Sequence, residues 1–349
     1  MNKYLLDNPY IDDILYQPEA LRSTIDGLAA LQFDKFQEFS ERLSSNLLER
    51  VVLTGMGSSL FALHPLRLRL IEHGIQTYMF ETSELIHFAP KLLSPETLLV
   101  AVSQSGHSAE IVQLVDLLQD KVPCIGVTNT ADSLLTEKSS VALVTQAGNE
   151  YSVSCKTYIT ALAGLSVLGD LLTGSDPAET LTAYQTSVND MAQYLAHWKE
   201  YVDSAIQELA GIRDLILVGR GPSMAAVETG GLIIKETAQF HSEGMSSAAF
   251  RHGPFELVSP ELFVLVYTGL EPTQQLNLNL AADIQNAGGR TELISRGESN
   301  NIFSLPMVPD AILPLFEILP SQLISIALAV LNQHIPGNFE IGTKVTEIP

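Results

Sequence analysis

The chain repeats a strand-and-glycine segment at a fixed spacing, and this repeat limits the folds open to it more than any other feature. The segment VVLTGMGSS, which starts at Val51, lines up with LILVGRGPS, which starts at Leu215, at an offset of 164 residues. The same offset places the apolar run 99–102 on the run 263–266. Two apolar runs that share one offset indicate a duplication, so we expect two copies of one α/β domain.

Short β-branched runs alternate with longer amphipathic stretches from residue 49 onward. The stretch 109–119 carries Ile111, Leu114 and Leu118 at helical spacing. Strands that alternate with helices predict βαβ units, and therefore a parallel sheet flanked by helices in each copy. The strands predicted for the first copy are 51–54, 77–80, 98–102, 124–128 and 141–145.

This pattern divides the chain into five segments. A length of 349 residues with 46% apolar residues is enough for two domains with a core each. We expect an N-terminal helical segment at 1–24, a first domain at 25–174, linking helices at 175–210, a second domain at 211–335 and a C-terminal tail at 336–349.

The charge balance indicates which partners the protein does not have. Nineteen Lys and Arg residues stand against 40 Asp and Glu residues, which gives a formal net charge of −21. This excess argues against binding to nucleic acid or to anionic membranes. Only 17% of the residues are charged, so we expect part of the apolar surface to lie in a subunit contact, and the protein to be a homodimer.

Neither export nor membrane insertion is indicated. Acidic residues appear within the first 13 positions before any signal-like apolar run. The most apolar stretch, 311–331, is interrupted by Pro314 and Pro320, so it predicts a buried helix rather than a membrane span. The two cysteines, Cys124 and Cys155, make neither a disulfide framework nor a zinc cluster. We expect a cytoplasmic protein without a metal, although ligands scattered along the sequence stay possible.

Two glycine- and serine-rich loops follow the first and third predicted strands. The carboxyl ends of parallel strands meet at one edge of the sheet, so both loops are expected there. Glycine N–H groups, serine hydroxyls and a helix dipole can bind phosphate without a lysine. The competing explanation is that each serine caps a helix. The first loop contains Gly55, Gly57, Ser58 and Ser59, and the second contains Ser103, Gln104, Ser105 and Ser108.

The same loops offer two further interpretations. Gly55 and Gly57, with Glu81 further on, resemble part of a dinucleotide-binding pattern, but Leu60 stands where a small residue is needed. We therefore favour phosphate binding without a nicotinamide cofactor, and expect no cofactor. In the second copy the third strand is followed by YTGL from Tyr267. If the first copy's loop binds an anion, we therefore expect that the second copy has lost this role.

The Ser-Gln-Ser-Gly-x-Ser loop, the pair Lys235-Glu236 and the segment FRHGP around His252 together resemble the SIS (sugar isomerase) family. The resemblance runs from about residue 26 to the C-terminus. It is strongest to the tandem-SIS isomerase portion of glucosamine-6-phosphate synthase and to stand-alone amino-sugar-phosphate deaminases and deglycases. It implies an α/β fold of two tandem SIS domains, each with a parallel, flavodoxin-like sheet flanked by helices. It also implies a phosphorylated sugar or amino sugar as substrate.

The resemblance also implies roles for particular residues. Glu236 is expected to move a proton between C1 and C2 of the sugar. His252, supplied by the neighbouring subunit, is expected to assist ring opening or protonation of the leaving group, and Lys344 matches a lysine of the family's C-terminal tail. The phosphate is expected on Ser59, Ser103, Gln104, Ser105 and Ser108, with Gly57, Ser58 and Val153 lining the rest of the pocket.

Elementary chemistry supports a carboxylate in this role. A base that takes a proton from carbon needs a pKa near neutrality, and partial burial raises the pKa of a carboxyl group. Glu236 follows Leu232, Ile233 and Ile234, so we expect it at the edge of a dry pocket. The alternatives are a solvated helix glutamate and, for His252, a turn residue.

Departures from the family pattern leave the reaction open. Thr229 and Ile233 occupy positions where the synthase has a glutamate and a lysine, and Glu228 is one residue out of register. The segment 150–157 resembles the family's E-x-x-V-A-x-T-K stretch but is a residue short. Without a glutaminase domain we expect no ammonia from glutamine. The candidates are deamination, deglycation and aldose-ketose isomerisation, against a non-catalytic sugar-phosphate sensor, which would commonly carry a helix-turn-helix.

Overall fold

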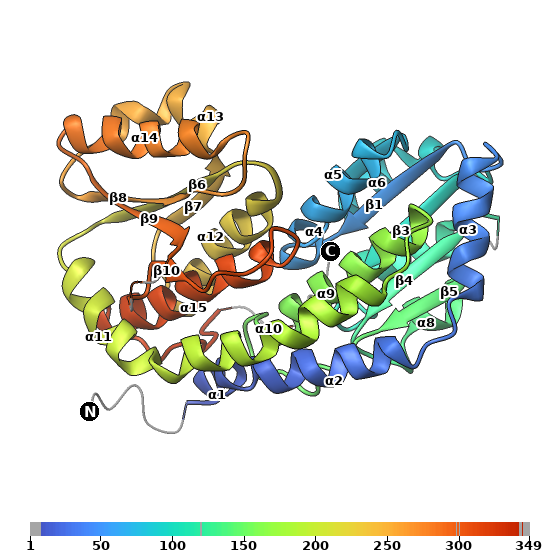
Figure 1. The fold of residues 1–349 in the computed structure, drawn as a ribbon, viewed down its shortest axis with the longest axis horizontal. Coiled ribbons are helices and arrows are strands. Elements are labelled where there is room, and N and C mark those ends of the chain that lie inside the picture. Colours follow the sequence, from blue (N-terminus) through green and yellow to red (C-terminus); the bar gives the residue numbers. More distant parts are fainter. Residues whose placement is uncertain (1–7, 119–120, 298, 300, 342–343, 345–349) are drawn as a thin grey trace. The chain divides into compact units, whose positions relative to one another are not determined.

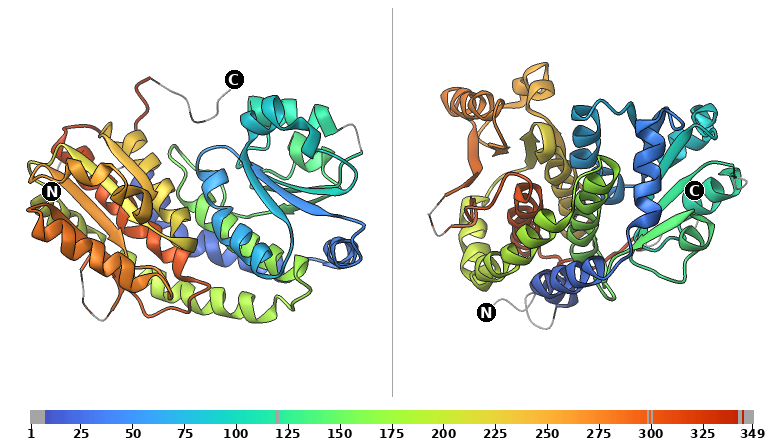
Figure 2. Two further views of the ribbon diagram at one scale, coloured as in Figure 1. Left: turned by 90° about the horizontal axis from the view of Figure 1, so that it is seen from above. Right: turned by 45° about the vertical axis from the view of Figure 1, so that its right-hand side comes forward.

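The computed structural model describes residues 8–118, 121–297, 299, 301–341 and 344 (Figure 1), and these form two compact units. Of the described residues, the first-sheet unit comprises 19–118, 121–149, 156–185 and 344, and the second-sheet unit comprises 8–18, 150–155, 186–297, 299 and 301–341. Each unit contains one five-stranded parallel sheet. Helices lie around each sheet (Figures 1 and 2). The predicted α/β fold with two parallel sheets is therefore confirmed.

The first-sheet unit has the strand order β2-β1-β3-β4-β5. All four neighbouring pairs are parallel, with Val51 opposite both Thr77 of β2 and Leu98 of β3. This is the flavodoxin-like order that the resemblance implies. The strands are β1 (Arg50–Gly55), β2 (Thr77–Glu81), β3 (Thr97–Val102), β4 (Cys124–Thr128) and β5 (Val141–Val144).

Helices cover both faces of the first sheet because its strands are apolar on both sides; every residue of β3 is buried. One face packs against α6, α7 and α8 through Leu85, Leu114 and Leu135. On the other face, Gly164 of α9 lies against Leu143 of β5. The helices are α2 (Gln17–Ala29), α3 (Asp34–Ser44), α4 (Ser58–Phe61), α5 (His64–Glu72), α6 (Thr82–Phe88), η2 (Pro90–Leu92), α7 (Ala109–Leu118), α8 (Leu134–Lys138) and α9 (Lys156–Leu172).

The second sheet repeats the order of the first, since β7-β6-β8-β9-β10 corresponds to β2-β1-β3-β4-β5. The predicted duplication is confirmed, with one correction to its spacing. Leu215 pairs with Phe263, whereas Val51 pairs with Leu98, so the offset is 164 at β1 and 165 at β3. The expected match of 99–102 with 263–266 is therefore displaced by one residue. The strands are β6 (Asp214–Gly219), β7 (Ser242–Ser246), β8 (Leu262–Tyr267), β9 (Arg290–Arg296) and β10 (Ser304–Leu305).

The extra residue lies between the first two strands of the second copy. Val51 pairs with Thr77 in the first sheet, and Leu215 pairs with Ser242 in the second, which is already an offset of 165. The connection between β1 and β2 contains α4 and α5, whereas the corresponding connection contains η3 (Gly221–Ser223) and the single long helix α12 (Met224–Ala238). A different helical connection thus accounts for the shift.

Helices of the second-sheet unit also form two layers. One face of the sheet packs on α13 and α14 through Phe250, Leu280 and Ile284. The remaining helices include α12 and α15, which pack together. The helices that complete the chain are α1 (Pro9–Leu15), α10 (Ala178–Ala196), α11 (Trp198–Glu208), α13 (Ser247–Arg251), η4 (Pro254–Leu257), α14 (Gln274–Asn286) and α15 (Leu313–Leu331).

The long apolar helix α15 is buried within the second-sheet unit. Within the described part of the chain it is the one helix that is long and apolar enough to cross a membrane, and 94% of its most apolar window is buried inside the protein. Pro314 lies in its first turn, where no backbone N–H is needed, and Pro320 lies within the helix. The buried core helix predicted for 311–331 is confirmed.

Candidate functional site

The two predicted phosphate-binding loops follow neighbouring strands of the first sheet. In the sheet β2 lies on one side of β1, and β3 lies on the other side. The connection that follows β1 and the connection that follows β3 therefore run in opposite directions from the carboxyl ends of these two strands. Ligands of doubly wound folds bind at such a switch point. Gly55 and Val102 are paired at these two ends, which places the loops 56–59 and 103–108 at the same edge. The structure therefore brings the two loops together.

Glycine is required where the first loop leaves the sheet. A Cβ atom on Gly55 would lie 2.9 Å from the backbone nitrogen of Leu60, closer than Cβ atoms are found, and 3.1 Å from the carbonyl oxygen of Val102. Gly57 has φ 51° and ψ −129°, a conformation that side chains seldom adopt. The backbone after β1 thus turns tightly into α4, and Ser58 and Ser59 at its start are partly exposed.

The second loop uses its serine oxygens as hydrogen-bond acceptors. The backbone N–H of Gly106 donates to Ser103 Oγ at 3.1 Å, and that of His107 donates to Ser105 Oγ at 3.2 Å. A hydroxyl that accepts a hydrogen bond keeps its own O–H for donation. Ser103 is buried, whereas Ser105 and Ser108 are partly exposed. The loop is therefore held in shape while its hydroxyl groups can still donate to an anion.

Gln104 is fixed through its backbone. Its carbonyl oxygen accepts hydrogen bonds from Thr128 Oγ1 at 3.2 Å and from the N–H of Asn129 at 3.1 Å. Ser108 directly precedes α7, and its carbonyl oxygen accepts from the N–H of Val112 at 3.0 Å. Ser108 therefore stands at the capping position of α7, as the helix-capping explanation expects. This position is compatible with phosphate binding, because a phosphate group would also bind at the N-terminus of α7.

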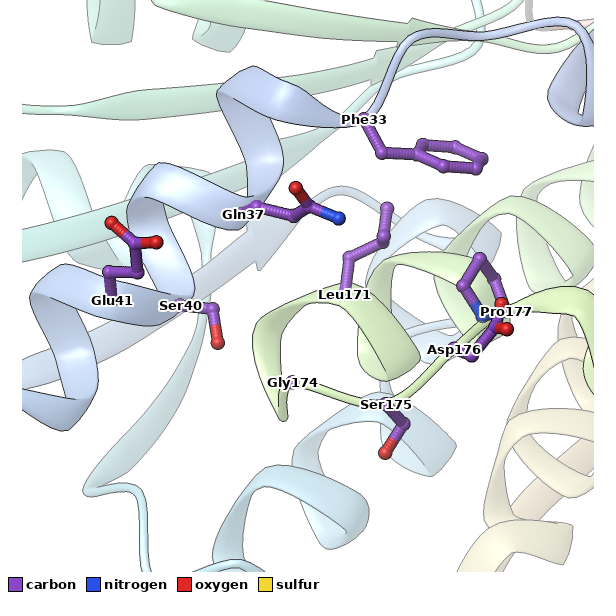
Figure 3. A pocket seen from close by; sticks show the side chains of 9 residues that line it. All are labelled: Phe33, Gln37, Ser40, Glu41, Leu171, Gly174, Ser175, Asp176 and Pro177. Carbon is purple, nitrogen blue, oxygen red and sulfur yellow. The ribbon is translucent and has the colours of Figure 1, made fainter.

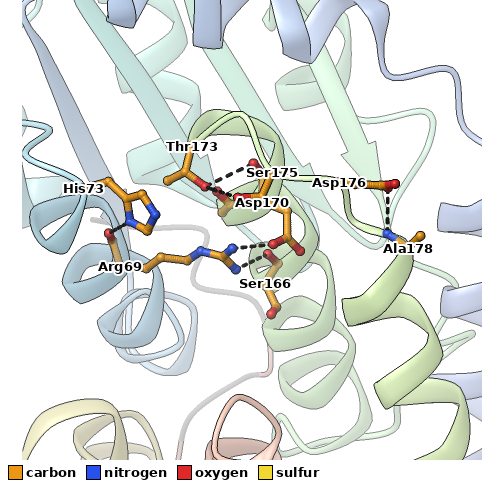
Figure 4. A network of polar contacts seen from close by, with 9 residues as sticks. Arg69, His73, Ser166, Asp170, Thr173, Ser175, Asp176 and Ala178 are labelled. Atoms are coloured by element: carbon orange, nitrogen blue, oxygen red, sulfur yellow. Dashed lines mark hydrogen bonds and ion pairs between the residues drawn. The ribbon is translucent and has the colours of Figure 1, made fainter.

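An ion pair holds the helix that continues from the first loop. The Arg69 guanidinium on α5 pairs with the Asp170 carboxylate on α9 and also donates to the Ser166 carbonyl oxygen (Figure 4). Asp170 is 5% exposed, so loss of one partner would leave a buried charge, which typically costs about 3–5 kcal/mol. Gly169 allows this contact, since its Cβ would lie 3.0 Å from Arg69 Cδ. The pair fixes α5 against α9.

Glu236 lies near the C-terminal end of α12 and is partly buried. Burial raises the pKa of its carboxyl group to about 7. The nearby positive charge of Lys235 opposes this shift, and the negative charge of Glu150 adds to it. A carboxyl group with a pKa of about 7 is suited to taking and returning a proton near neutral pH. The predicted dry environment of Glu236 is consistent with this shift.

Segments far apart in the sequence surround Glu236 within the second-sheet unit. Glu150 is buried, and its Oε1 accepts a hydrogen bond from the N–H of Cys155 at 2.9 Å. Tyr10 of α1 is also buried; its hydroxyl lies 3.1 Å from Ser325 Oγ, and the charge of Glu236 contributes to raising its pKa. The sequence did not single out Glu150 or Tyr10 as site residues. The E-x-x-V resemblance pointed toward Glu150, but no local pattern pointed to Tyr10.

The other predicted site residues lie in different surroundings. His252 is exposed at the end of α13, and Val153 is 1% exposed in the segment Glu150–Cys155. Both belong, with Glu236, to the second-sheet unit, whereas the phosphate loops belong to the first-sheet unit. Lys344 belongs to the first-sheet unit and is partly exposed. Its sequence neighbours 343 and 345–349 lie outside the described residues.

The positions that depart from the family pattern are buried. Thr229 and Ile233, which replace the synthase's glutamate and lysine, are both 0% exposed. Glu228 is partly buried and Lys235 is exposed. Lys235 is therefore the lysine of this helix that acts on the Glu236 carboxyl group.

A hollow of about 550 Å³ lies elsewhere in the first-sheet unit (Figure 3). Its walls come from α3 and from the end of α9 with the connection to α10, and they include Gln37, Glu41, Leu171 and Asp176. None of the predicted phosphate or catalytic residues lines it. This hollow therefore does not coincide with the predicted site.

Comparison with known proteins agrees with the predicted resemblance. Residues 48–169 match the family described as SIS domain. The glutamine--fructose-6-phosphate aminotransferase [isomerizing] of Pyrococcus horikoshii is 30% identical over 350 residues, which cover 93% of this chain and 55% of that protein. The chain thus spans about half the length of the curated relatives it matches.

Solved structures share the fold. The C-terminal domain of glucosamine-fructose-6-phosphate aminotransferase from Francisella tularensis superposes with a TM-score of 0.80 at 22% identity, covering 95% of this chain and 99% of that one. Tagatose-6-phosphate ketose/aldose isomerase from Escherichia coli also gives 0.80 at 21% identity, covering 98% of both chains. A glucosamine-6-phosphate deaminase from Thermotoga maritima gives 0.72 at 18% identity, covering 98% and 100%. The tandem arrangement expected for the fold is confirmed.

Proposed function

Residues 48–169 belong to the SIS domain family, and on that basis we propose that this protein is a phosphosugar-processing enzyme. It moves a proton between C1 and C2 of a phosphorylated sugar or amino sugar by acid/base catalysis, without a cofactor. The observation that carries the proposal is the partly buried Glu236, whose pKa burial raises to about 7. A solvated helix glutamate would have no such environment.

The phosphate end of the substrate is assigned to the switch-point loops of the first sheet. Ser59, Ser105 and Ser108 offer partly exposed hydroxyl groups there. The N-terminus of α7 adds backbone N–H groups and the positive end of a helix dipole. These are neutral donors, so they suit a dianionic phosphate in a protein whose net charge is −21. Gln104 and Ser103 complete this loop.

The reacting end is assigned to Glu236. Its carboxylate takes the proton from one of the two carbons, which gives an enediol or enolamine, and returns the proton to the neighbouring carbon. His252 assists at the ring oxygen or the leaving nitrogen, since an imidazole titrates near working pH. Lys344 is a third candidate for this end. Because His252 is exposed on its own subunit, its proposed place is the active site of the partner subunit in a homodimer.

Three reactions share this proton transfer: aldose-ketose isomerisation, deamination of an amino sugar 6-phosphate, and deglycation of a fructosamine 6-phosphate. The names of the relatives support the class, since they include an isomerizing aminotransferase, a ketose/aldose isomerase and a glucosamine-6-phosphate deaminase. All three names refer to a sugar 6-phosphate. We therefore propose the proton transfer between C1 and C2, which the three reactions share, and experiment must identify the leaving group.

A substrate panel tests the proposal. The protein is incubated with glucosamine 6-phosphate, fructose 6-phosphate, tagatose 6-phosphate and a fructosamine 6-phosphate, and the products are followed by mass spectrometry and ammonia detection. We expect turnover of at least one member, abolished in Glu236→Gln. Binding of several members without turnover of any would instead identify a non-catalytic sugar-phosphate sensor.

A further inference from the structure

Ser223 in the second sheet is the counterpart of Ser59 in the first. Each lies four residues after the glycine that ends the first strand of its sheet, Gly219 and Gly55, at the offset of 164. Ser59 is partly exposed, but Ser223 is 1% exposed. Its hydroxyl donates a hydrogen bond to Glu317 Oε1 at 2.8 Å. The second serine thus already binds a carboxylate that belongs to the protein.

This carboxylate lies at the switch point of the second sheet. The strands β6 and β8 are neighbours in the order that corresponds to β1 and β3. Gly269 follows β8, and a Cβ atom on it would lie 3.1 Å from Ser223 Oγ, so the two connecting loops meet at this serine. Glu317 comes from α15 and is 1% exposed. The place where a ligand would enter is therefore filled by a side chain.

The surroundings contain groups that favour a negative charge, whereas burial opposes it. The 15-residue helix α12 begins at Met224, directly after Ser223, and the side chain of Ser223 makes no capping hydrogen bond to the helix. The N-terminus of such a helix favours an anion. The second carboxylate oxygen of Glu317, Oε2, is buried and has no hydrogen-bond partner. Burial raises the pKa of Glu317 to about 7, whereas Ser223 and the charge of Arg296 favour its ionised form.

We propose that Glu317 is a built-in anion. Its carboxylate occupies the anion-binding position of the second sheet (the second seat), which corresponds to the position proposed for the substrate's phosphate group in the first sheet (the first seat). The duplicated fold therefore binds one phosphosugar per chain rather than two. Loss of the carboxylate opens the second seat to a free anion such as inorganic phosphate. The count of one ligand rests on the proposed function, whereas the opening of the seat does not.

Two measurements test the inference at pH 8, where Glu317 is mostly ionised. The first is the stoichiometry of fructose 6-phosphate binding to the intact chain by calorimetry, with one site per chain expected. The second uses Ser105→Ala/Ser108→Ala as the background, so that the first seat is impaired. When Glu317→Ala is added to that background, we expect inorganic phosphate to raise the melting temperature by more than sodium chloride does at equal ionic strength. Glu317→Gln, which keeps the side chain's volume, is the matched control and is expected to show no such difference.

Three outcomes would overturn the inference. The first is that the intact chain binds two molecules of fructose 6-phosphate. The second is that phosphate stabilises the Ser105→Ala/Ser108→Ala background itself, and that Ser223→Ala removes this stabilisation. The third is that the Glu317→Ala variant folds but does not respond to phosphate. If Glu317→Ala does not fold, the stoichiometry decides. If none of the four sugar phosphates of the panel binds and Glu317→Ala still responds to phosphate, the proposed function is contradicted and the proposal for the second seat is supported.

Discussion

The backbone N–H of Gly106 donates to Ser103 Oγ at 3.1 Å, so a buried serine holds the shape of the loop after β3. Gly106 has φ +66°, and a Cβ atom on it would lie 2.4 Å from Ser133 Oγ. The turn therefore needs glycine both for its conformation and for space. Ser105 directly precedes Gly106, and the chain continues from the turn through Ser108 to the start of α7.

Removal of the hydroxyl groups of the partly exposed serines of this loop should weaken substrate binding. Ser105→Ala with Ser108→Ala is expected to raise KM for the phosphorylated substrate by about tenfold or more, because each hydrogen bond to a charged group is worth roughly 1.5–3 kcal/mol. Steady-state kinetics with calorimetry measure the effect. Ser175→Ala, which removes an exposed hydroxyl from the connection between α9 and α10, is the control. An unchanged KM in the double variant would move the anion site elsewhere.

The rate should depend on the ionisation of Glu236. As the base, this residue acts as a carboxylate, so kcat/KM is expected to rise with pH to a plateau, with a midpoint near its pKa of about 7. The negative charge of Glu150 raises that pKa and the positive charge of Lys235 lowers it. Glu150→Gln should therefore move the midpoint to lower pH, and Lys235→Met to higher pH. Shifts in the same direction, or none, would contradict the electrostatic assignment.

Mixed dimers should reveal a shared active site. If His252 acts in the partner subunit, a dimer of one Glu236→Gln subunit and one His252→Ala subunit contains one intact site and one doubly altered site. Random pairing of equal amounts should then restore about a quarter of the wild-type activity. The measurement is turnover after the two inactive proteins are unfolded and refolded together. No recovery, with dimers verified by light scattering, would place both residues in one protomer.

Much of the fold could be predicted from local pattern. The run 124–128 coincides with β4, and the helical stretch 109–119 coincides with α7 to Leu118, while residue 119 lies outside the described chain. Burial on both faces makes parallel strands visible as continuous apolar runs. The one-residue shift between β3 and β8 could not be predicted, because neighbouring registers of an apolar run look alike in sequence.

The candidate site was predictable only in part, because long-range contacts leave no local signal. The serine loops were visible because they directly follow predicted strands. The hydrogen bond between Ser223 and Glu317 joins residues 94 positions apart, and Tyr10 approaches Glu236 from the first described helix. No periodicity in one sequence predicts such pairs. The buried position of Glu150 likewise depends on where the segment Glu150–Cys155 folds.

Glu317 should make stability depend on pH. Its pKa is raised from 4.5 to about 7 in the folded protein, so between these values the folded state keeps a proton that the unfolded state has lost. The resulting stability is fully present below pH 4.5 and is lost as pH rises through 7, by about 3 kcal/mol. Urea unfolding from pH 5 to 8 should show this loss in the wild type relative to Glu317→Gln. A difference between the two proteins that stays constant with pH would contradict it.

Solvent exchange at carbon tests the central claim most directly. The protein is incubated in D₂O with each sugar phosphate that it binds, and deuterium at C1 or C2 is followed by NMR, whichever product forms. The account predicts incorporation by the wild type, and incorporation at least about a hundredfold slower by Glu236→Gln, with substrate affinity unchanged. Glu243→Gln, an exposed glutamate on β7, should exchange like the wild type. Wild-type exchange by Glu236→Gln would contradict the account.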